Sequence, residues 1–480
     1  MATADRFNLA EYFVDRHVAE GRGAKIALVT EAGALTYAEV LALVNQAGNA
    51  LRGLGVGRGD RVLLLLPDGP DFVAAYFGAA RIGAVAAPTS TALRAADYAY
   101  FLKESEARAV VVHQSLREQV AAAPNVVVAP GWLDGQPAEM DPATTRGDDP
   151  AFWLWTSGST GAPKAAVHRH GDWLPCCEGY ARGVLGIGPH DATFSSSKLF
   201  HAYGLGNSLL FPFYTGASSV LYAGRPQPRA ILEMAEKRRP TLFFSVPTLY
   251  AAMLTETDAG NPYKLDGVRL GVSAAEPLPA EIGRRWKQRF GFELLDGVGS
   301  TEALHIYLSS GRPVPGYHLR LTEDGDLWVR GASVTPGYWN RPELSAARLQ
   351  DGWFWTGDKF TMDLEGRYIY AGRSDDMFRV SGQWVSPAEV EAVLVEHPAV
   401  LESAVAPFED ENSLLKPKAY VVLKPGAAPD EALARELREF VKSRIAPHKY
   451  PRRIDFLEEL PKTATGKIQR FKLREGRASS

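Results

Sequence analysis

The sequence predicts an α/β protein in which a large N-terminal domain of doubly wound sheets, with subdomains, precedes a small α+β domain. A chain of 480 residues is longer than one hydrophobic core usually supports, so we expect more than one domain. Up to Arg373, apolar runs typical of buried strands alternate with stretches of helical periodicity, which is the rhythm of βαβ units. Beyond Arg373 the pattern changes to that of a small α+β module. We therefore divide the chain into residues 1–374 and 375–480.

The first elements show how this pattern is read. Thr36 is followed three residues later by Glu39, which is a capping box, and apolar residues then recur at helical spacing. The spacing predicts a helix over residues 37–53. The next elements predicted in order are a buried strand at 61–66, a helix at 72–82 and a parallel strand at 109–112.

The second half of the pattern is set by a loop and by a second capping box. Residues 137–150, rich in Asp, Gly and Thr, read as a loop that divides two subdomains. Ser386 and Glu389 form the second capping box and begin a helix. Residues 418–423 then read as a strand, and the apolar positions of 433–441 predict a further helix.

Composition limits the classes of partner. With a net charge of −3, 46% hydrophobic and 23% charged residues, the chain resembles an ordinary globular protein, without electrostatic attraction to nucleic acid or to an anionic membrane. We expect no signal peptide, because the N-terminus MATADRFN lacks a basic segment followed by an apolar one, and no membrane span, because the apolar run 241–254 is broken by Ser245 and Pro247. The only cysteines, Cys176 and Cys177, are adjacent, which suits neither a disulfide framework nor a zinc site and favours a reducing cytoplasm.

The stretch TSGSTGAPKAAVH, residues 156–168, carries the first indication of chemistry. It directly follows the apolar run 152–155. A loop of Gly, Ser and Thr after a buried strand exposes backbone N–H groups and hydroxyls that can bind an anion, and Lys164 adds a positive charge. The Walker pattern is absent because Lys164 follows Pro163. Taken alone, the stretch could also be a Gly/Ser-rich surface loop.

Five motifs in order decide between these readings. They are TSGSTGAPKAAVH, DGVGSTEALH (296–305), WFWTGDKF (353–360), YAGRSDDMFRVSGQWVSPAEVE (370–391) and PKTATGKIQR (461–470). Together they resemble the ANL superfamily of acyl-adenylating enzymes, and KLFHAYGLGN (198–207) with DGVGSTEALHIYLSS (296–310) is most similar to its benzoate- and aryl-CoA ligases. The resemblance implies that a carboxylate and ATP give acyl-AMP and pyrophosphate, and that the acyl group then passes to coenzyme A. It also implies that the small domain is mobile.

The resemblance assigns the nucleotide site residue by residue. It implies that Lys164 offsets phosphate charge, that Glu302 is the Mg²⁺ ligand and that Lys467 reaches the carboxylate and the α-phosphate. The residues that match ATP- and AMP-binding positions are Thr156, Ser157, Gly158, Ser159, Thr160, Gly161, Ala274, Ala275, Glu276, Asp296, Gly297, Thr301, Asp358 and Arg373.

The acyl and thiol sites are assigned in the same way. The residues implied to wall the aryl group are Ala202, Tyr203, Gly204, Val298, Gly299 and His305, and those implied to line the CoA tunnel are His201, Ser381, Gly382 and Trp384. Asp375 matches the hinge about which the small domain rotates. Val298 stands where most members carry an aromatic ring against adenine. Members of the superfamily that activate amino acids usually carry an aspartate in the region 201–204, where it holds the substrate ammonium. None occurs there in this sequence, which disfavours an amino-acid substrate.

Three functions remain open at this point. The first is an aryl-CoA ligase acting on benzoate or on a hydroxy- or aminobenzoate. The second is an adenylating enzyme that loads an aryl acid onto a separate acyl-carrier protein. The third is a non-catalytic binding protein, which the presence of Lys164, Glu302, Asp358, Arg373 and Lys467 disfavours.

Overall fold

The fold alternates strands and helices, as the sequence predicts. The computed structural model describes residues 6–120, 123, 125–156, 162–258, 260, 263–380, 383–411, 414–462 and 468–474. The chain forms two compact units, Met1–Leu319 with Val329–Trp355, and Arg320–Trp328 with Thr356–Ser480. A large α/β part with a smaller C-terminal one is thereby confirmed. The predicted boundary between residues 374 and 375 concerns where the small domain rotates, and it stays a prediction.

A largely parallel sheet lies in the first unit. Nine strands of the described chain pair in the order β15 (Arg312–Pro313), β14 (Ile306–Ser309), β13 (Leu294–Gly299), β12 (Leu270–Ala274), β11 (Leu242–Ser245), β9 (Ala192–Ser195), β10 (Ser218–Val220), β1 (Ile26–Val29) and β2 (Ala34–Thr36). From β13 to β1 in this order, neighbouring strands are parallel. The carboxyl ends of these strands therefore share one edge of the sheet.

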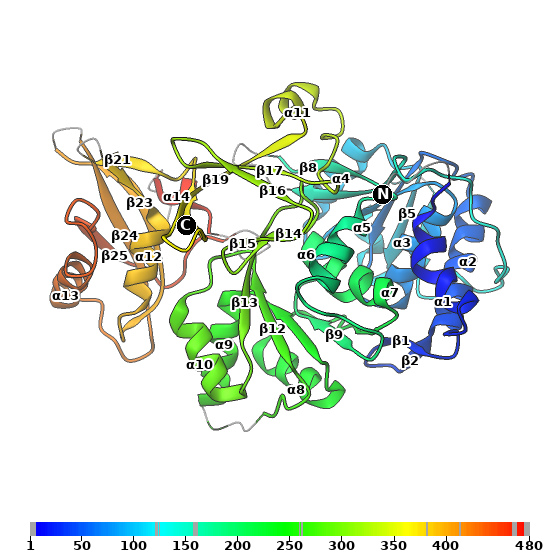
Figure 1. The fold of residues 1–480 in the computed structure, drawn as a ribbon, viewed down its shortest axis with the longest axis horizontal. Helices are drawn as coiled ribbons and strands as arrows, with labels where there is room; N and C mark the ends of the chain where they lie inside the picture. The colour runs from blue at the N-terminus through cyan, green and yellow to red at the C-terminus, as the bar shows by residue number, and fades with distance from the viewer. Residues whose placement is uncertain are drawn as a thin grey trace. The chain divides into compact units, whose positions relative to one another are not determined.

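Three helices lie beside β12 and β13 of this sheet (Figure 1): α8 (Pro228–Arg238), α9 (Pro247–Asp258) and α10 (Ala280–Phe290). Ile231, Tyr250 and Trp286 come from these helices, one from each, and pack with Phe194 and Phe243 of the strands. All five side chains are buried, and each such burial stabilises the fold by roughly 1.5–3 kcal/mol.

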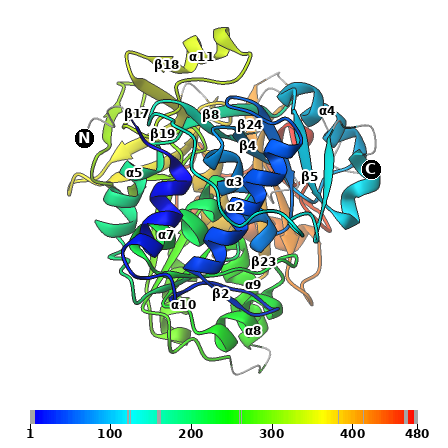
Figure 2. The same cartoon turned by 90° about the vertical axis from the view of Figure 1, so that its right-hand side faces the viewer.

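A second, mostly parallel sheet completes the core of this unit. Six of the strands that the structure describes pair in the order β6 (Val126–Ala129), β5 (Ala109–His113), β3 (Arg61–Leu65), β4 (Val85–Pro88), β7 (Pro150–Thr156) and β8 (Lys164–Arg169). Helices α2 (Tyr37–Gly53) and α3 (Pro70–Arg81) lie side by side (Figure 2). They approach closely at Gly78, where a Cβ would lie 2.6 Å from the Cβ of Ala47. A side chain at position 78 would therefore push the two helices apart.

Shorter elements connect these parts. The remaining helices described in the first unit are α1 (Arg16–Ala19), α4 (Ala95–Ser105), α5 (Trp173–Cys176), α6 (Ala202–Leu205), α7 (Phe211–Thr215) and α11 (Pro342–Arg348), with 3₁₀ or π segments at Glu11–Asp15, Gln114–Val120, Cys177–Arg182 and Gly206–Leu210. A third sheet orders β16 (His318–Leu321), β17 (Asp326–Arg330), β19 (Trp353–Met362) and β18 (Leu349–Gln350), and β20 (Tyr368–Arg373) pairs with β19.

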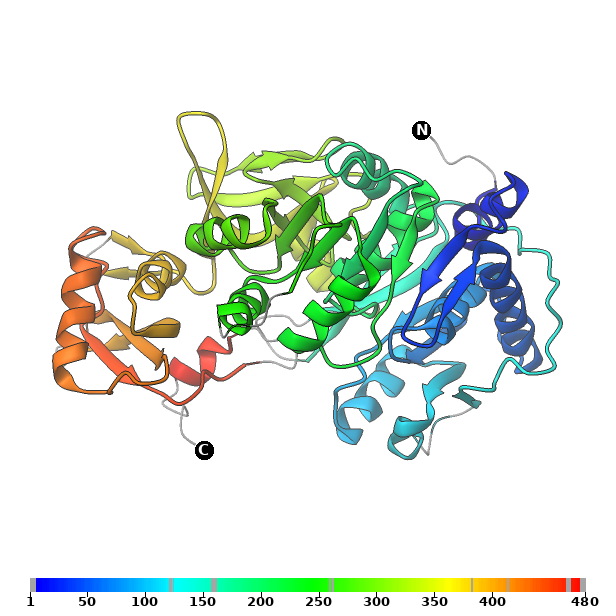
Figure 3. The same ribbon diagram turned by 90° about the horizontal axis from the view of Figure 1, so that it is seen from below.

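The C-terminal part of the second unit is a small α+β module. Its elements are the hairpin β21 (Phe378–Val380) and β22 (Gln383–Val385), the sheet of β23 (Val400–Glu409), β24 (Leu415–Leu423) and β25 (Arg453–Phe456), and helices α12 (Pro387–Val395), α13 (Glu431–Lys442) and α14 (Arg470–Arg474). The orange helix α13 lies along this sheet (Figure 3). Leu437 of α13 is buried against Val405 and Val421 of the strands.

Most predicted elements are confirmed, and one capping box is only half formed. Thr36 and Glu39 make both bonds of the first box, and α2 covers residues 37–53. At the second, the Ser386 hydroxyl accepts from the Glu389 N–H, but the Glu389 carboxylate binds the Lys449 ammonium at 2.6 and 2.8 Å. A charged partner competes successfully with a single backbone N–H for that carboxylate. No helix in the described ranges is both long and apolar enough to cross a membrane.

Candidate active site

The frame of the predicted phosphate loop is a β-hairpin. Strands β7 and β8 pair antiparallel, and Thr156 lies opposite Lys164 at the end that the loop connects. Residues Ser157 to Gly161, which were predicted to bind phosphate, lie outside the described residues. The register nevertheless shows that both ends of the loop are held by one ladder.

Lys164 and Glu302 are brought together by a tyrosine that the sequence analysis did not single out. The ammonium nitrogen of Lys164 lies 4.4 Å from the centre of the Tyr338 ring. The Tyr338 hydroxyl donates to Oε1 of Glu302 at 2.7 Å. The Glu302 side chain is only 8% exposed, so its charge needs such partners. The Lys164 ammonium and the Glu302 carboxylate, which come from distant parts of the chain, thus contact the same tyrosine side chain.

The backbone around Glu302 is tied to β8. Nε2 of buried His168 lies 2.8 Å from the Thr301 carbonyl oxygen, and because a carbonyl only accepts, Nε2 carries the proton. The Thr335 N–H donates to the Glu302 carbonyl oxygen at 2.8 Å. Thr301 is predicted to bind nucleotide, and the hydrogen bond from His168 to its carbonyl oxygen fixes its backbone.

The predicted adenine walls lie at the carboxyl end of β12 and in β13. Ala274 is the last residue of β12 and pairs with Gly297, while Ala275 and Glu276 follow directly. Burial raises the pKa of Asp296 to about 6. Open α/β sheets bind ligands at the carboxyl ends of their strands. The structure therefore gathers these residues at the expected edge, and their contact with adenine stays a prediction.

Two glycines of β13 are required by the neighbouring strand. A Cβ on Gly297 would lie 2.5 Å from Cδ1 of Ile306, and one on Gly299 would lie 2.6 Å from the His305 carbonyl oxygen. Val298, between them, is half-buried. The absence of side chains at 297 and 299 thus lets β14 approach, in addition to any role toward a ligand.

Tyr203 and His305 form the aromatic part of the predicted acyl site. The Tyr203 hydroxyl donates to the Val272 carbonyl oxygen at 3.1 Å, and its own carbonyl oxygen lies 3.4 Å from Nε2 of His305. The His305 ring also packs against Phe211 and Tyr180, with centroids 4.5 and 5.7 Å apart. Burial lowers the pKa of His305 to about 3. This end of the site is therefore aromatic and uncharged at neutral pH.

The turn before α6 sets the position of Tyr203. His201 is the N-cap residue of α6, and its N–H donates to the Lys198 carbonyl oxygen at 3.0 Å. Ala202 is half-buried at the start of the helix. At Gly204 a Cβ would overlap the carbonyl oxygens of Ser197 and Lys198. Glycine at position 204 is therefore needed for α6 to pack against the turn at residues 197–198 that precedes it.

A buried ion pair that the sequence analysis missed holds the same turn. Oδ1 of Asp68 accepts from the Leu199 N–H at 3.0 Å, and Oδ2 lies 3.7 Å from Nζ of Lys198. Nζ also donates to the Tyr222 carbonyl oxygen at 2.5 Å. Burial raises the pKa of Asp68 to about 6 and lowers that of Lys198. The available signal was a charged residue two positions after the apolar run 61–66, beyond the carboxyl end of a parallel strand.

In the second unit, the predicted ribose-binding pair is formed. Asp358 of β19 and Arg373 of β20 lie opposite each other in register. Nη1 of Arg373 donates to Oδ1 of Asp358 at 2.9 Å and to the Thr356 carbonyl oxygen at 3.2 Å. The contact of this pair with a ribose hydroxyl stays a prediction.

Beyond the predicted hinge Asp375, an arginine links two ends of the module. Arg470 donates to both carboxylate oxygens of Glu391, at 2.7 and 3.2 Å, and to Asp376 at 3.2 Å. It thereby ties the segment that follows residue 467 to the residue beside the hinge. Lys467 itself lies outside the described residues.

Besides His201, Trp384 is the residue of the predicted CoA tunnel that the structure describes, since Ser381 and Gly382 fall outside the described residues. Its side chain is 40% exposed on β22. The guanidinium carbon of Arg379 lies 4.5 Å from its ring centre, and Nζ of Lys359 lies 5.6 Å away. An exposed indole next to two cations can bind an amphipathic chain ending in phosphates.

The sequence matches the family of AMP-binding enzymes over residues 15–339 and the AMP-binding enzyme C-terminal domain over residues 389–467. The chain belongs to the AMP-binding enzyme family. A benzoate–CoA ligase of Thauera aromatica is 46% identical, over 98% of this chain and 96% of the relative.

Solved structures of similar fold agree with this family assignment. The fold matches an anthranilate CoA ligase in complex with anthranoyl-AMP with a TM-score of 0.93 and 38% identity, over 99% of this chain and 98% of the other. It matches a benzoate CoA ligase from Burkholderia xenovorans LB400 with a TM-score of 0.91 and 44% identity, over 98% of this chain and 100% of the other.

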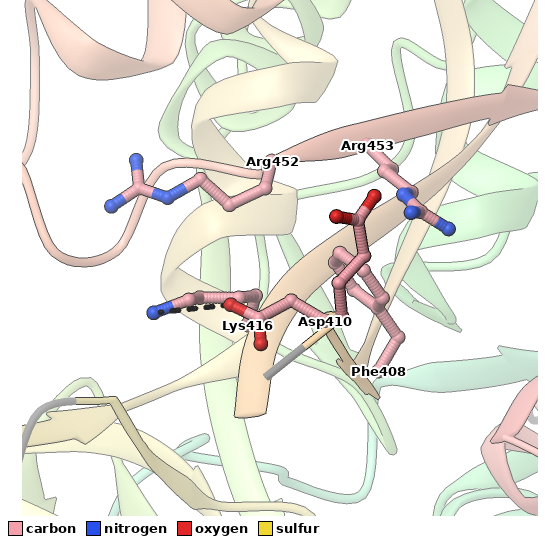
Figure 4. A pocket seen from close by; sticks show the side chains of 6 residues that line it. Phe408, Asp410, Lys416, Arg452 and Arg453 are labelled. Carbon is pink, nitrogen blue, oxygen red and sulfur yellow. Dashed lines mark ion pairs between the residues drawn. The ribbon is translucent and has the colours of Figure 1, made fainter. Parts of the chain in front are cut away.

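The C-terminal module of this AMP-binding enzyme also carries a charged surface hollow (Figure 4). It is lined by Phe408, Asp410, Glu411, Lys416, Arg452 and Arg453. The Arg453 guanidinium lies over the Phe408 ring at 4.7 Å, and Lys416 pairs with Asp410 at 3.7 Å. The predicted site residues are not among those that line this hollow.

Proposed function

We propose that this AMP-binding enzyme converts benzoate, or a hydroxy- or aminobenzoate, to its coenzyme A thioester. It is an AMP-forming acid–thiol ligase, as the family and the 46% identical benzoate–CoA ligase support. The observation that carries the choice of acid is the uncharged aromatic pair of Tyr203 and His305 at the edge of the sheet. A flat aromatic acid gains most from such a surface.

The first half-reaction joins two anions. A carboxylate oxygen of the acid attacks the α-phosphorus of ATP, a C–O–P linkage forms, and the bond to pyrophosphate breaks. Lys164 beside Glu302 places a positive charge at the phosphate end, while Asp358 and Arg373 hold the ribose. Such preorganised charges supply most of the catalysis in phosphoryl chemistry.

Mg²⁺ fits the donor set at Glu302. Within the described chain, no three His, Cys, Asp or Glu side chains form a metal cluster. Mg²⁺ is usually held by one or two carboxylates together with substrate phosphates, so one largely buried carboxylate is sufficient. When bound, the ion offsets charge on the phosphates. Glu302 would hold it through the oxygen that does not accept from Tyr338.

In the second half-reaction the thiol sulfur attacks the acyl carbon, a C–S bond forms, and the bond to AMP breaks as the thiol proton leaves. We assign His201 to the tunnel mouth, Trp384 to the pantetheine chain and Asp375 to the rotation that admits it. Coenzyme A is the acceptor that the relatives support. Both ATP and coenzyme A are cytoplasmic metabolites, so we place the reaction there.

A substrate panel tests this proposal. Pyrophosphate release and thioester formation would be measured with benzoate, hydroxybenzoates, aminobenzoates, cinnamate, acetate and a long-chain acid, with coenzyme A and with carrier proteins as acceptors. We expect the highest kcat/KM for a benzoate-type acid with coenzyme A. Preference for acetate or a long-chain acid would contradict the aryl assignment, and thioester formation on a carrier protein alone would replace coenzyme A as the acceptor.

A further inference from the structure

Tyr338 contacts both charged groups of the phosphate end, one through its hydroxyl and one through its ring. We propose that Tyr338 is a positioning residue that aims the Glu302 carboxylate at Mg²⁺ and holds the Lys164 ammonium beside it. The inference rests on the proposed role of Glu302 as the metal ligand. It follows from two contacts, 2.7 Å from the hydroxyl to Oε1 of Glu302 and 4.4 Å from Nζ of Lys164 to the ring centre.

The backbone of Tyr338 is fixed to the phosphate hairpin itself. Tyr338 forms a β-bridge with Ala166 of β8, and the Trp339 N–H donates to the Ala165 carbonyl oxygen at 3.0 Å. On its other side, the Tyr338 N–H donates to Oγ of Ser345 in α11 at 2.9 Å. The backbone that carries the ring is therefore paired with β8, the strand that begins at Lys164. The bridge partner Ala166 lies two residues after Lys164 in that strand.

The hydroxyl acts as a permanent donor to the carboxylate. A phenol has an ordinary pKa of about 10, so at neutral pH the Tyr338 hydroxyl keeps its proton and donates it to Oε1 of Glu302 at 2.7 Å. Because Oε1 accepts this proton, the carboxylate is held in one orientation, and its other oxygen remains for a cation. A hydrogen bond to a charged group is worth enough to change an affinity about tenfold or more.

The ring face acts on Lys164 separately. A cation over an aromatic face gains about 0.5–1 kcal/mol at an exposed site, which is roughly a two- to fivefold change in affinity. This attraction does not require the hydroxyl. The two contacts can therefore be removed one at a time, since Tyr338→Phe removes only the hydroxyl, whereas Tyr338→Leu removes the hydroxyl and the aromatic face.

The test measures ATP binding without turnover. Equilibrium dialysis of ATP, with no aryl acid present, would be carried out in EDTA and across a Mg²⁺ titration for the wild type, Tyr338→Phe, Tyr338→Leu, Glu302→Gln and the double variant Glu302→Gln/Tyr338→Phe. Tyr37→Phe is the matched control, because Tyr37 is fully buried and its hydroxyl donates to the Ala217 carbonyl oxygen at 2.7 Å. It loses a comparable bond away from the site.

We expect Tyr338→Phe to raise the Mg²⁺ concentration for half-maximal ATP binding about tenfold and to leave ATP affinity in EDTA unchanged. Tyr338→Leu should also weaken ATP in EDTA by roughly threefold. The double variant should respond to Mg²⁺ as Glu302→Gln does, since the hydroxyl acts through that carboxylate.

Two results would overturn the inference, and they have different meanings. If Glu302→Gln shifts the Mg²⁺ dependence while Tyr338→Phe matches Tyr37→Phe, Tyr338 is only structural and the metal assignment stands. If Glu302→Gln leaves the Mg²⁺ dependence unchanged, Glu302 is not the ligand, and both proposals fail together.

Discussion

At the scale of single residues, buried neutral histidines make the fold sensitive to acid. His170 is fully buried, and its Nδ1 accepts from the Leu9 N–H at 3.0 Å. Burial lowers its pKa to about 4, and that of His305 to about 3. A histidine whose pKa is lowered by folding binds a proton more readily when unfolded. Its stabilising contribution is therefore complete above about pH 6.5 and is lost as the pH falls toward 4.

We predict that His170→Asn reduces this acid sensitivity. At pH 5, each of the two histidines should cost the wild type about 2 kcal/mol relative to neutral pH. Asparagine can still accept from the Leu9 N–H, but it does not titrate. The measurement is the urea midpoint at pH 7.5 and at pH 5, with His190→Asn, an exposed position, as the control. An equal drop in the wild type and in His170→Asn would show that position 170 does not cause the loss.

At the scale of the element, the short helix α6 depends on its turn. If Gly204 only lined the acyl pocket, a methyl group there would be tolerated by a small acid. The overlap with the Ser197 and Lys198 carbonyl oxygens instead predicts that Gly204→Ala displaces α6 and Tyr203 with it.

We therefore expect Gly204→Ala to lower the melting temperature, by an amount corresponding to about 1–3 kcal/mol, and to raise the KM for benzoate more than that for ATP. Steady-state kinetics and thermal unfolding would measure both effects. Gly188→Ala is the matched control, because a Cβ there meets nothing within 4 Å. Wild-type behaviour of Gly204→Ala would mean that the turn can relax at no cost.

Sequence patterns predicted elements better than they predicted partners. The capping box at Thr36, and the apolar run beginning at Arg61, depend on neighbours within a few residues, and α2 and β3 follow. Glu389 shows the limit, since its preferred partner, Lys449, lies 60 residues away. Such pairs are decided by which helices, strands and loops become neighbours, and periodicity does not specify that arrangement.

The same limit explains what was missed at the site. The resemblance located Lys164 and Glu302, but nothing local indicates that Tyr338 joins them, because its partners come from β8 and from the loop at 302. Asp68 and Lys198 likewise meet only once β3 and the turn before α6 are placed. For Asp68, the signal available was its place two residues after the predicted strand 61–66.

At the scale of the whole molecule, the two half-reactions should be separable. Lys467→Ala should slow acyl-AMP formation by roughly 2–4 kcal/mol, the effect of one transition-state charge contact, and still convert supplied benzoyl-AMP to the thioester. Asp375→Pro, with φ fixed near about −65°, should retain adenylation and lose thioester formation. Single-turnover assays of each step would test this, after circular dichroism confirms folding. Equal slowing of both steps by both variants would contradict domain rotation.

The two-segment composition of the second unit has a consequence for recombining this enzyme with its relatives. Ser374 donates to Asp326 at 2.6 Å, and Thr356 donates to the Leu327 carbonyl oxygen at 3.0 Å, so residues 320–328 belong with the chain that follows residue 355. In a chimaera that joins two parental sequences at residue 355, the hydroxyls of Thr356 and Ser374 would come from one parent and their acceptors at 326 and 327 from the other. A crossover after Ser374 keeps both bonds within one parental sequence, so we expect chimaeras joined there to fold more readily than chimaeras joined at 355.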